Sequence, residues 1–347
     1  MHALTLESRP RIGWGLLGAG GISGQLVRAL SHVPEARLVA VGSRDAARAR
    51  AFIDASRGDE APREPVRAHG SYRALVEDPA VDVVYIGTPH PDHAPSMRLA
   101  LEAGKAVLCE KPFTVNRREA QAAVALARAR GCFLMEAMWM RFVPAMVELR
   151  RLLAAGAIGE VVSACADFGF ATAGLPPTHR ALDPALAGGG LLDVGIYPLS
   201  FAAFVLGPVE AVQASAEIGP TGVDVHTVFN LRHAGGRLAQ GLCSLRATTA
   251  CLATVLGTAG RIDVTPPFYA AQQLRVVRGA GPSELAPVEV IDRPWRGSPY
   301  VAQVEEVHRC LRAGLAESPV MPLDESVALV GWMDAMRAQV GLRYPMD

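Results

Sequence analysis

Apolar and polar positions follow two alternating periods in the N-terminal part of the chain. Short apolar runs, typical of buried strands, occupy 12–17, 38–41, 81–87, 107–109 and 132–135. Between them, apolar residues recur at helical spacing in 22–33, 46–55, 72–77, 93–103 and 117–130, and a polar loop is predicted at 57–65. Strands that alternate with helices in this way predict a parallel sheet with helices on both faces.

The remainder of the chain has a different pattern. A helix is predicted at 144–155, a long strand at 160–170 and an apolar helix at 188–206. The chain then becomes rich in strands, predicted at 209–217, 223–231, 237–245, 253–256, 261–264, 274–277 and 288–291. Their close spacing favours a largely antiparallel sheet, and amphipathic helices at 301–313 and 324–340 end the chain.

Length and composition predict two globular domains. A chain of 347 residues exceeds the size at which single hydrophobic cores usually stop growing. We place an N-terminal tail at 1–11, a first domain at 12–137 and a second domain at 138–347. Lysine plus arginine and aspartate plus glutamate both number 34, which argues against a general attraction to nucleic acid or to acidic membranes.

The N-terminus and the cysteines bear on the compartment. The polar segment 1–11 lacks the apolar core of a signal peptide, and we identify no apolar run of the roughly 20 residues that a membrane span requires. The six cysteines include no Cys-x-x-Cys pair, so we expect free thiols in a reducing cytoplasm. Zinc-site spacing is not found either, and we expect no metal.

A glycine-rich turn follows the first predicted strand directly. Gly18, Gly20, Gly21, Ile22 and Ser23 lie between that strand and a helix, which is the order that a dinucleotide pyrophosphate requires. Glycines let the backbone approach the phosphates, and the helix N-terminus offers free N–H groups and a positive dipole end. We therefore predict a dinucleotide site, and the alternative is a tight turn without a ligand.

The second predicted strand ends in Gly42-Ser43-Arg44-Asp45. An NAD site usually carries an acid here, which binds the ribose hydroxyls. A hydroxyl and a guanidinium in its place suit a 2′-phosphate through charge-assisted hydrogen bonds, while Asp45 fits the N-terminus of the next helix. Ser43 and Arg44 therefore predict NADP rather than NAD. The alternative for Arg44 is a surface residue beside a helix cap.

Two opposite charges end the predicted strand 107–109. Burial of Glu110 or Lys111 is costly unless the charge is paired, and Pro112 holds Lys111 away from helical angles. Lys111 could there donate to a substrate hydroxyl and, with a pKa lowered by desolvation, carry a proton. The alternative is a salt-bridged strand end before a turn.

The segment 88–93 has the sequence Thr-Pro-His-Pro-Asp-His and follows a predicted strand. Two histidines three residues apart suggest a metal pair, but the prolines and the lack of a third ligand argue against it. We predict that His90 contacts the cofactor and that His93 packs beneath the lysine strand at the same site. The predicted cofactor site also includes Thr88, Glu110, Lys111 and Arg141.

Two further segments carry large or ionisable side chains. Trp139, Arg141 and Phe142 lie where the predicted domains join, a common place for ligands, and packing between domains is the alternative. Asp193 and Tyr197 are four residues apart and so share one face of a predicted apolar helix. An acid and a phenol on that face indicate a site, and a buried hydrogen-bonded pair is the alternative.

In combination, these motifs resemble the glucose–fructose oxidoreductase/inositol dehydrogenase family. Within it, the chain is most similar to the dimeric dihydrodiol dehydrogenases, also described as NADP-linked D-xylose dehydrogenases. The resemblance covers residues 10–340 and rests on 87–93, 104–112, 134–142, 189–197 and 221–224. It implies a Rossmann domain followed by an α/β domain whose large open, mostly antiparallel sheet often forms a dimer interface. Residues 225–226 and the loop 171–183 depart from the subgroup's pattern.

The resemblance also implies roles for individual residues. Lys111 and Tyr197 are the expected proton-handling pair, Asp193 is expected to support the substrate hydroxyl, and Lys111-Pro112 is expected to be a cis peptide. Trp139 and Phe168 match positions that line the substrate pocket in the subgroup. The expected partners are NADP, a small sugar or diol and a second copy of the chain, without nucleic acid or a membrane.

The expected function is hydride transfer between nicotinamide and a CH–OH group of an aldose such as D-xylose, or of a trans-dihydrodiol. One alternative is a non-catalytic, NADP-sensing regulator of the same fold, and the presence of Lys111, Asp193 and Tyr197 together favours the enzyme. Another is a glycoside hydrolase that retains NAD. Ser43 and Arg44 argue against the hydrolase, because its chemistry resembles that of NAD-binding relatives.

Overall fold

The computed structural model describes residues 11–56, 65–279 and 287–347. The predicted tail at 1–11 and the predicted loop at 57–65 fall almost entirely outside these residues. The described chain forms two compact units, one of residues up to Trp139 with Arg296–Val327, the other of Met140–Trp295 with Ala328–Asp347. The segment Arg296–Val327 thus lies in the first unit, whereas we expected it in the second domain.

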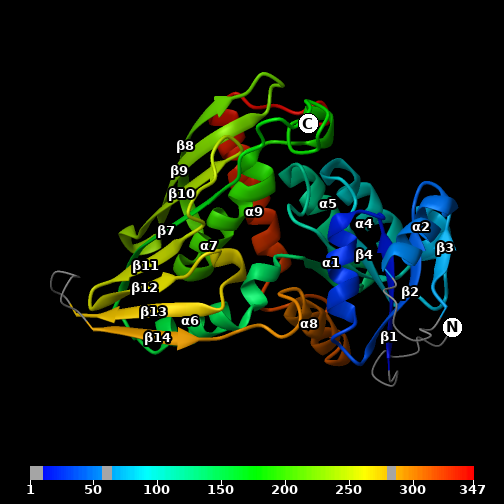
Figure 1. Ribbon diagram of the computed structural model, residues 1–347, viewed down its shortest axis with the longest axis horizontal. Coiled ribbons are helices and arrows are strands. Elements are labelled where there is room, and N and C mark those ends of the chain that lie inside the picture. The colour runs from blue at the N-terminus through cyan, green and yellow to red at the C-terminus, as the bar shows by residue number, and fades with distance from the viewer. Residues whose placement is uncertain (1–10, 57–64, 280–286) are drawn as a thin grey trace. The chain divides into compact units, whose positions relative to one another are not determined.

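Six parallel strands form the sheet of the first unit, in the order β3-β2-β1-β4-β5-β6 (Figure 1). The strands are β1 (Ile12–Leu17), β2 (Ala36–Gly42), β3 (Arg67–His69), β4 (Val83–Ile86), β5 (Ala106–Cys109) and β6 (Leu134–Glu136). This is the strand order of Rossmann domains, whose ligands bind where the order reverses, beyond the carboxyl ends of β1 and β4.

The helices of the first unit pack in two sets. They are α1 (Gly21–Leu30), α2 (Ala46–Ser56), α3 (Tyr72–Val76), α4 (His93–Glu102), α5 (Arg117–Arg130) and α8 (Val301–Arg312). Helix α1 packs with α8, and α4 packs with α3 and α5. The predicted strands and helices of this unit are all present within a few residues of their predicted ends, and β3 is the additional strand.

A buried indole–imidazole pair joins α8 to the centre of the first unit's sheet. Trp14 in β1 is fully buried, and its Nε1–H donates to Nε2 of His308 in α8 at 3.0 Å. Because Nε2 accepts this hydrogen bond, the ring of His308 is neutral and carries its proton on Nδ1. Burial, together with the positive charge of Arg312, lowers the pKa of His308 to about 4.

We expect protonation of His308 to lower the free energy of unfolding in mild acid. The unfolded chain binds the proton below about pH 6.5, whereas the folded protein binds it only near pH 4, so protonation between these values favours unfolding. The contribution of His308 to the free energy of unfolding is largest above pH 6.5, and it falls by roughly 2–3 kcal/mol between pH 7 and pH 4.5. Urea unfolding across this range should show the loss in the wild type and not in His308→Gln, whose amide oxygen can still accept from Trp14. An identical pH dependence in the two proteins would exclude this group as the cause.

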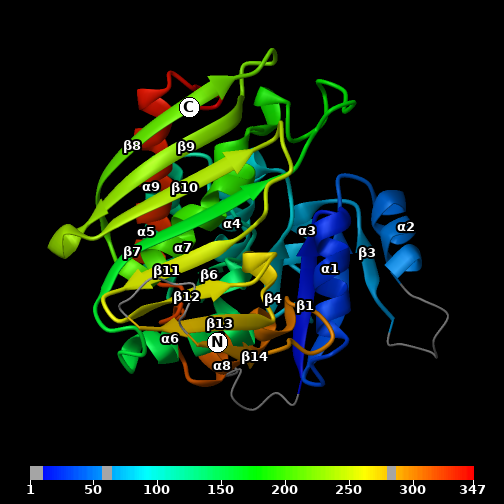
Figure 2. The same ribbon diagram turned by 60° about the vertical axis from the view of Figure 1, so that its left-hand side comes forward.

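The second unit contains an eight-stranded sheet in the order β14-β13-β12-β11-β7-β10-β9-β8 (Figure 2). The strands are β7 (Val161–Gly169), β8 (Val209–Ile218), β9 (Asp224–His233), β10 (Leu238–Ser244), β11 (Ala253–Gly257), β12 (Gly260–Val264), β13 (Gln273–Arg278) and β14 (Val288–Asp292). All neighbouring pairs are antiparallel except β7 with β10. The prediction of a mostly antiparallel sheet is confirmed.

Helices cover one face of this sheet. Figure 2 shows the opposite face of the sheet toward the viewer, with the helices behind it. They are α6 (Pro144–Ala154), α7 (Ile196–Leu206) and the part of α9 (Leu323–Gln339) from Ala328 onward. Helix α7 packs on the central strands β7 and β10. Along β7 the side chains alternate, with Ala164 and Ala166 buried on the helix side and Cys165 exposed on the other.

Among the described residues, one helical stretch is long and apolar enough to cross a membrane. It is Pro184–Leu206, with 23 residues, whereas the sequence analysis expected none. Within its most apolar window, 89% of the residues are buried inside the protein, against β7 and β10. Core helices pass the same test of length and composition, so the stretch is weak evidence for a membrane span.

Candidate active site

The glycine turn after β1 brings two strand ends and a helix very close together. Gly18 has φ +97°, and a Cβ there would lie 2.6 Å from the carbonyl oxygen of Gly87 after β4. The hydroxyl of Ser23 in α1 donates to the carbonyl of Gly18 at 2.7 Å, and a Cβ at Gly87 would lie 2.7 Å from that hydroxyl. Only glycine fits at Gly18 and Gly87, and the small Ser23 adds a hydrogen bond to the turn.

The N-terminus of α1 has open space in front of it. Among the residues that the structure describes, a Cβ added to Gly20 or Gly21 would meet no other atom within 4 Å, and no side chain caps the helix at Gly20. Ile22, the next residue, is half-buried. Free helical N–H groups beside uncrowded glycines form a cradle for phosphate oxygens, so this turn fits the pyrophosphate of a dinucleotide.

The end of β2 has the features expected of a nucleotide ribose site. Ser43 is buried and Arg44 is exposed. The carboxylate of Asp45 accepts from the backbone N–H two residues further on, at the start of α2 (2.7 Å). Asp45 is therefore engaged by the helix, as expected of a helix N-terminal residue.

Arg48, which we did not predict as a site residue, is a second arginine beyond the end of β2. Burial raises the pKa of Tyr72, the carboxylate of Asp92 adds to the rise, and the positive charges of Arg44 and Arg48 oppose it. The positive charges of both arginines therefore act on the same phenol. Arg48 lies in the first turn of α2, just after Arg44, and a basic residue so close to the end of β2 is the sequence signal that could have identified it.

His93 links the turn after β4 to the end of β5. Its Nδ1 lies 2.9 Å from the carbonyl oxygen of Pro112 and its Nε2 lies 3.0 Å from that of Thr88. Burial lowers the pKa of His93, which favours a neutral ring that donates to one carbonyl at a time. The ring of His90 lies 5.8 Å away, and the Lys111–Pro112 peptide is cis, as the resemblance implies.

The Glu110 carboxylate fixes the strand end that carries Lys111. Glu110 accepts from the hydroxyl of Tyr85 at 2.7 Å and from the backbone N–H of Lys111 at 3.2 Å. Burial raises the pKa of Glu110, and burial with the adjacent Glu110 charge raises the pKa of Tyr85 well above its ordinary value. Strand β5 thus ends in a buried hydrogen-bonded acid, which holds the lysine backbone in place.

Thr88 and Trp139, which we predicted to contact the cofactor and the substrate, lie in the first unit. The hydroxyl oxygen of Thr88 is buried and has no hydrogen-bond partner within the described part of the chain, so it could bind a ligand atom. Trp139, predicted to line the substrate pocket, stacks at a tilt on Tyr300, with ring centroids 4.6 Å apart. The glycine cradle, the arginine pair and Thr88 together fit a dinucleotide.

In the second unit, the chain turns sharply before α7. Gly189 has φ +117°, and a Cβ there would lie 2.3 Å from Oδ1 of the buried Asp224. Oδ2 of Asp224 accepts from the N–H of Leu191 at 2.7 Å, and the hydroxyl of Tyr344 donates to the carbonyl of Gly188 at 2.5 Å. Residues Leu191–Gly195 form a π-helical turn, where we predicted an α-helix, and such turns are frequent at functional sites.

Asp193 and Tyr197 lie in a cluster of aromatic and charged side chains. Both are buried, and the Asp193 carboxylate lies 3.2 Å from the Arg180 guanidinium. The ring of Tyr197 is 5.4 Å from those of Phe168 and Tyr269, which stack on each other at 4.3 Å. Arg180 and Tyr269 were not predicted, because Arg180 lies in an irregular loop and Tyr269 in a three-residue 3-10 helix, which is too short to give a periodic signal. The cluster offers a polar end and an aromatic wall, as sites for polyols or cyclic diols require.

Arg141, a predicted cofactor contact, binds α7 in the second unit. It is buried, its Nε donates to the hydroxyl of Ser200 at 3.0 Å, and its guanidinium lies over the ring of Phe204 at 5.5 Å. These contacts fasten the segment after Trp139 to the helix that carries Tyr197. The contact of Arg141 with the cofactor stays a prediction.

Metal ligation has no candidate group in the ranges 11–56, 65–279 and 287–347. There, no three or more His, Cys, Asp or Glu side chains are placed to hold an ion. The two ring nitrogens of His93 lie 2.9 Å and 3.0 Å from carbonyl oxygens, and the one that carries the proton donates to its carbonyl.

Comparison with known proteins identifies the family of both units. The family model described as "Oxidoreductase family, NAD-binding Rossmann fold" matches residues 12–138, and "GFO/IDH/MocA C-terminal domain" matches residues 146–263. The trans-1,2-dihydrobenzene-1,2-diol dehydrogenase of Mus musculus is 41% identical over 339 residues, which cover 96% of this chain and 98% of that protein.

Solved structures agree with this assignment. The aldose-aldose oxidoreductase from Caulobacter crescentus, complexed with glycerol, is 25% identical with a TM-score of 0.82, covering 95% of this chain and 98% of that chain. A 3-ketoreductase from Actinomadura kijaniata, in complex with NADP and TDP-benzene, is 27% identical with a TM-score of 0.81 and the same coverage. The resemblance inferred from the motifs is confirmed. The chain belongs to the GFO/IDH/MocA family of oxidoreductases and is an NAD(P)-dependent dehydrogenase acting on CH–OH donors.

Proposed function

We propose that the protein is an NADP-dependent dehydrogenase that oxidises a CH–OH group of an aldose such as D-xylose, or of a trans-dihydrodiol. The observation that carries the substrate class is the cluster of Asp193, Tyr197 and Phe168, in which a buried acid and a phenol adjoin an aromatic wall. The names of relatives support it, since they include a dihydrodiol dehydrogenase and an aldose-aldose oxidoreductase.

The proposed acid–base chemistry uses side chains of this chain. Oxidation of an alcohol requires its hydroxyl to lose a proton, and a bound oxidised nicotinamide would accept the hydride from the same carbon. A phenol is ordinarily a poor base at neutral pH, but a neighbouring ammonium favours the phenolate. We propose that Tyr197 and Lys111 handle this proton as a coupled pair and that Asp193 orients the substrate hydroxyl by accepting from it.

A substrate panel tests this function. Purified protein is mixed with NADP and, separately, with NAD, and with D-xylose, other aldoses and trans-dihydrodiols, while absorbance of the reduced nicotinamide is followed. We expect turnover with at least one sugar or diol. A protein that binds NADP but reduces none of it would favour the non-catalytic sensor, and a tightly retained NAD with glycoside cleavage would favour the hydrolase.

We also propose that the enzyme prefers NADP to NAD. It is supported by Arg44 and Arg48, whose two positive charges act on the same phenol of Tyr72 beyond the end of β2. Paired guanidinium groups suit a 2′-phosphate, which an NAD ribose lacks. A relative of known structure was also solved with NADP.

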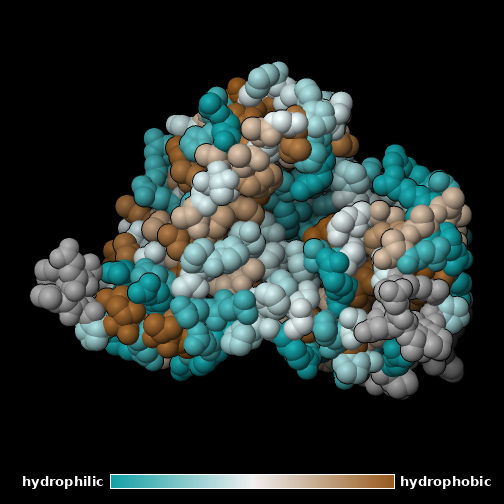
Figure 3. All heavy atoms as spheres, in the orientation of Figure 1, coloured by the Kyte–Doolittle hydropathy of each residue, from teal (hydrophilic) through white to brown (hydrophobic). Residues whose placement is uncertain are grey.

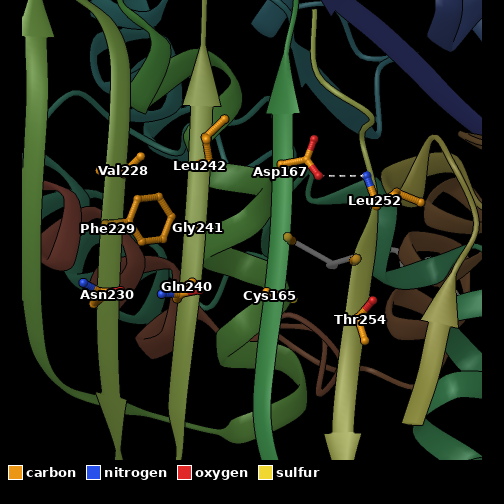
Figure 4. Close-up of a pocket in the computed structure, with 12 residues that line it drawn as sticks. Cys165, Asp167, Val228, Phe229, Asn230, Gln240, Gly241, Leu242, Leu252 and Thr254 are labelled. Atoms are coloured by element: carbon orange, nitrogen blue, oxygen red, sulfur yellow. Dashed lines mark hydrogen bonds between the residues drawn. The ribbon is translucent and has the colours of Figure 1, made fainter. Parts of the chain in front are cut away.

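We further propose that the protein is a homodimer joined through the outer sheet face, defined here by Val228, Leu238, Leu252 and Leu256. These side chains are each at least 41% exposed. Figure 4 shows a hollow on this face, about 510 Å³ in volume, lined with polar groups that include Asp167 and apolar groups that include Val228. Hydrophobic atoms also reach the surface over β13 and β14 (Figure 3). Exposed apolar side chains that gather on one sheet face support an interface there.

Light scattering at micromolar concentration tests the dimer. We expect the mass of two 36.7-kDa chains for the wild type and of one chain for Val228→Glu, because a carboxylate on each copy would be buried without a partner. Val147→Glu is the matched control, since Val147 is 56% exposed on α6 and away from the outer sheet face. A wild type with the mass of one chain would remove the proposal.

We also propose a cellular compartment, and the thiols support it. All six cysteines are free, including the exposed Cys165. Free thiols persist in reducing compartments, so we propose a cytoplasmic location, which fractionation of cells that express the protein would test.

A further inference from the structure

Arg180 lies on a loop that is built into the turn before α7. The N–H of Gly189 donates to the carbonyl of Ala181 at 2.9 Å, and a Cβ at Gly188 would lie 2.8 Å from the carbonyl oxygen of Arg180. Ala181 is also buried in one hydrophobic cluster with Val194 of the π-helical turn. The backbone of Arg180 is therefore fixed beside the turn that carries the proposed active-site acid.

The guanidinium of Arg180 covers that acid on its solvent side. Nη1 lies 3.2 Å from Oδ2 of Asp193, and the Arg180 side chain is 59% exposed while that of Asp193 is 4% exposed. The ion pair thus joins an exposed guanidinium, which solvent screens, to a buried carboxylate. Phe168 packs against the same hydrophobic cluster as Ala181, so the aromatic wall and Arg180 belong to one site.

The pair of groups has a specific chemical complement. A carboxylate only accepts hydrogen bonds, a guanidinium only donates them, and a hydroxyl does both. Two hydroxyls on adjacent carbons have oxygen atoms about one hydrogen-bond length apart, which is close to the separation of the Arg180 and Asp193 groups. One hydroxyl of such a diol can therefore donate to Asp193 while its neighbour accepts from Arg180.

We propose that Arg180 is a specificity-determining residue that binds the hydroxyl next to the reacting one, so that the preferred substrates are vicinal diols. This inference rests on the proposed function, in which Asp193 orients the reacting hydroxyl. It unites aldoses and dihydrodiols as one substrate class, because both present two hydroxyls on adjacent ring carbons.

Matched substrate pairs test the inference with NADP as cofactor. D-xylose is compared with 2-deoxy-D-xylose, and trans-cyclohexane-1,2-diol with cyclohexanol, in the wild type, Arg180→Ala and Arg180→Lys. We expect Arg180→Ala to lower kcat/KM roughly ten- to a hundredfold for the diol member, mainly through KM, and to leave the member without the second hydroxyl within about twofold. Arg180→Lys should lie between, since it keeps the charge without the fork.

A control variant and the possible outcomes distinguish a failure of the role of Arg180 from a failure of the proposed function. Arg246→Ala is the control, because Arg246 is also exposed and paired with an acid, Glu217, in the same unit, and it should behave like the wild type. An equal loss on both members of a pair, or no loss on either, would overturn the role of Arg180. A wild type that oxidises none of the four compounds would instead count against the proposed function.

Discussion

Tyr197→Phe is expected to lower turnover by roughly 10²–10⁴, while NADP affinity changes far less. The phenol ring would remain packed near Phe168 and Tyr269, because only the hydroxyl is removed. Loss of the hydroxyl removes one member of the proposed proton-handling pair and leaves the cofactor cradle at Gly20 and Gly21 unaltered. Steady-state kinetics across a pH profile, with NADP binding measured separately, checks both parts. Near-full turnover at every pH would assign proton transfer to Lys111 alone.

Lys111→Met should cut turnover over the same range, roughly 10²–10⁴. The substitution removes the ammonium and keeps an unbranched side chain of similar length. The chain contains only two lysines, and the other provides a matched control. Lys105 lies just before β5, at its opposite end, where its ammonium donates to the carbonyls of Asp78 and Val81. Lys105→Met should lower stability and leave turnover per folded molecule close to that of the wild type. Equal losses in the two variants would show that Lys111 acts structurally.

The elements that sequence predicts well are those whose ends are set by local chemistry. Helix α5 has its predicted bounds because Asn116 accepts from the N–H of Glu119 at one end and Gly131 takes φ +61° at the other. The strand–glycine–helix order at Gly18 likewise depends on neighbours in sequence. For such segments, the residue types alone specify the local structure.

The features that escaped prediction depend on residues far apart in the chain. The π-helical turn at Leu191–Gly195 is held by Asp224, and α8 joins the first unit through Trp14 and His308, which are 294 positions apart. Arg180 lies in an irregular loop and Tyr269 in a 3-10 helix of three residues, and neither segment gives a periodic signal. Tertiary contacts decide such positions, and a single sequence does not display them.

Arg44→Ala should raise the KM for NADP roughly ten- to a hundredfold and leave the KM for NAD nearly unchanged. A charge-assisted contact between a guanidinium and a phosphate is worth on the order of 1.5–3 kcal/mol, and each 1.4 kcal/mol corresponds to about a tenfold change in affinity. Only NADP carries the 2′-phosphate, so only NADP should lose this contact.

Arg48 and Arg50 of α2 provide a second variant and a control for the test of the 2′-phosphate site. Arg48 lies in the first turn of α2 and its charge acts on the same Tyr72 as that of Arg44, so Arg48→Ala should also weaken NADP binding, and the double variant should approach equal use of the two cofactors. Arg50, exposed on the same helix, provides the control, since Arg50→Ala should change neither KM. Raising the salt concentration should weaken NADP in the wild type more than in Arg44→Ala, because a charge–charge contact is screened. Equal losses for NADP and NAD in Arg44→Ala would show that Arg44 supports the fold of this region and does not select the cofactor.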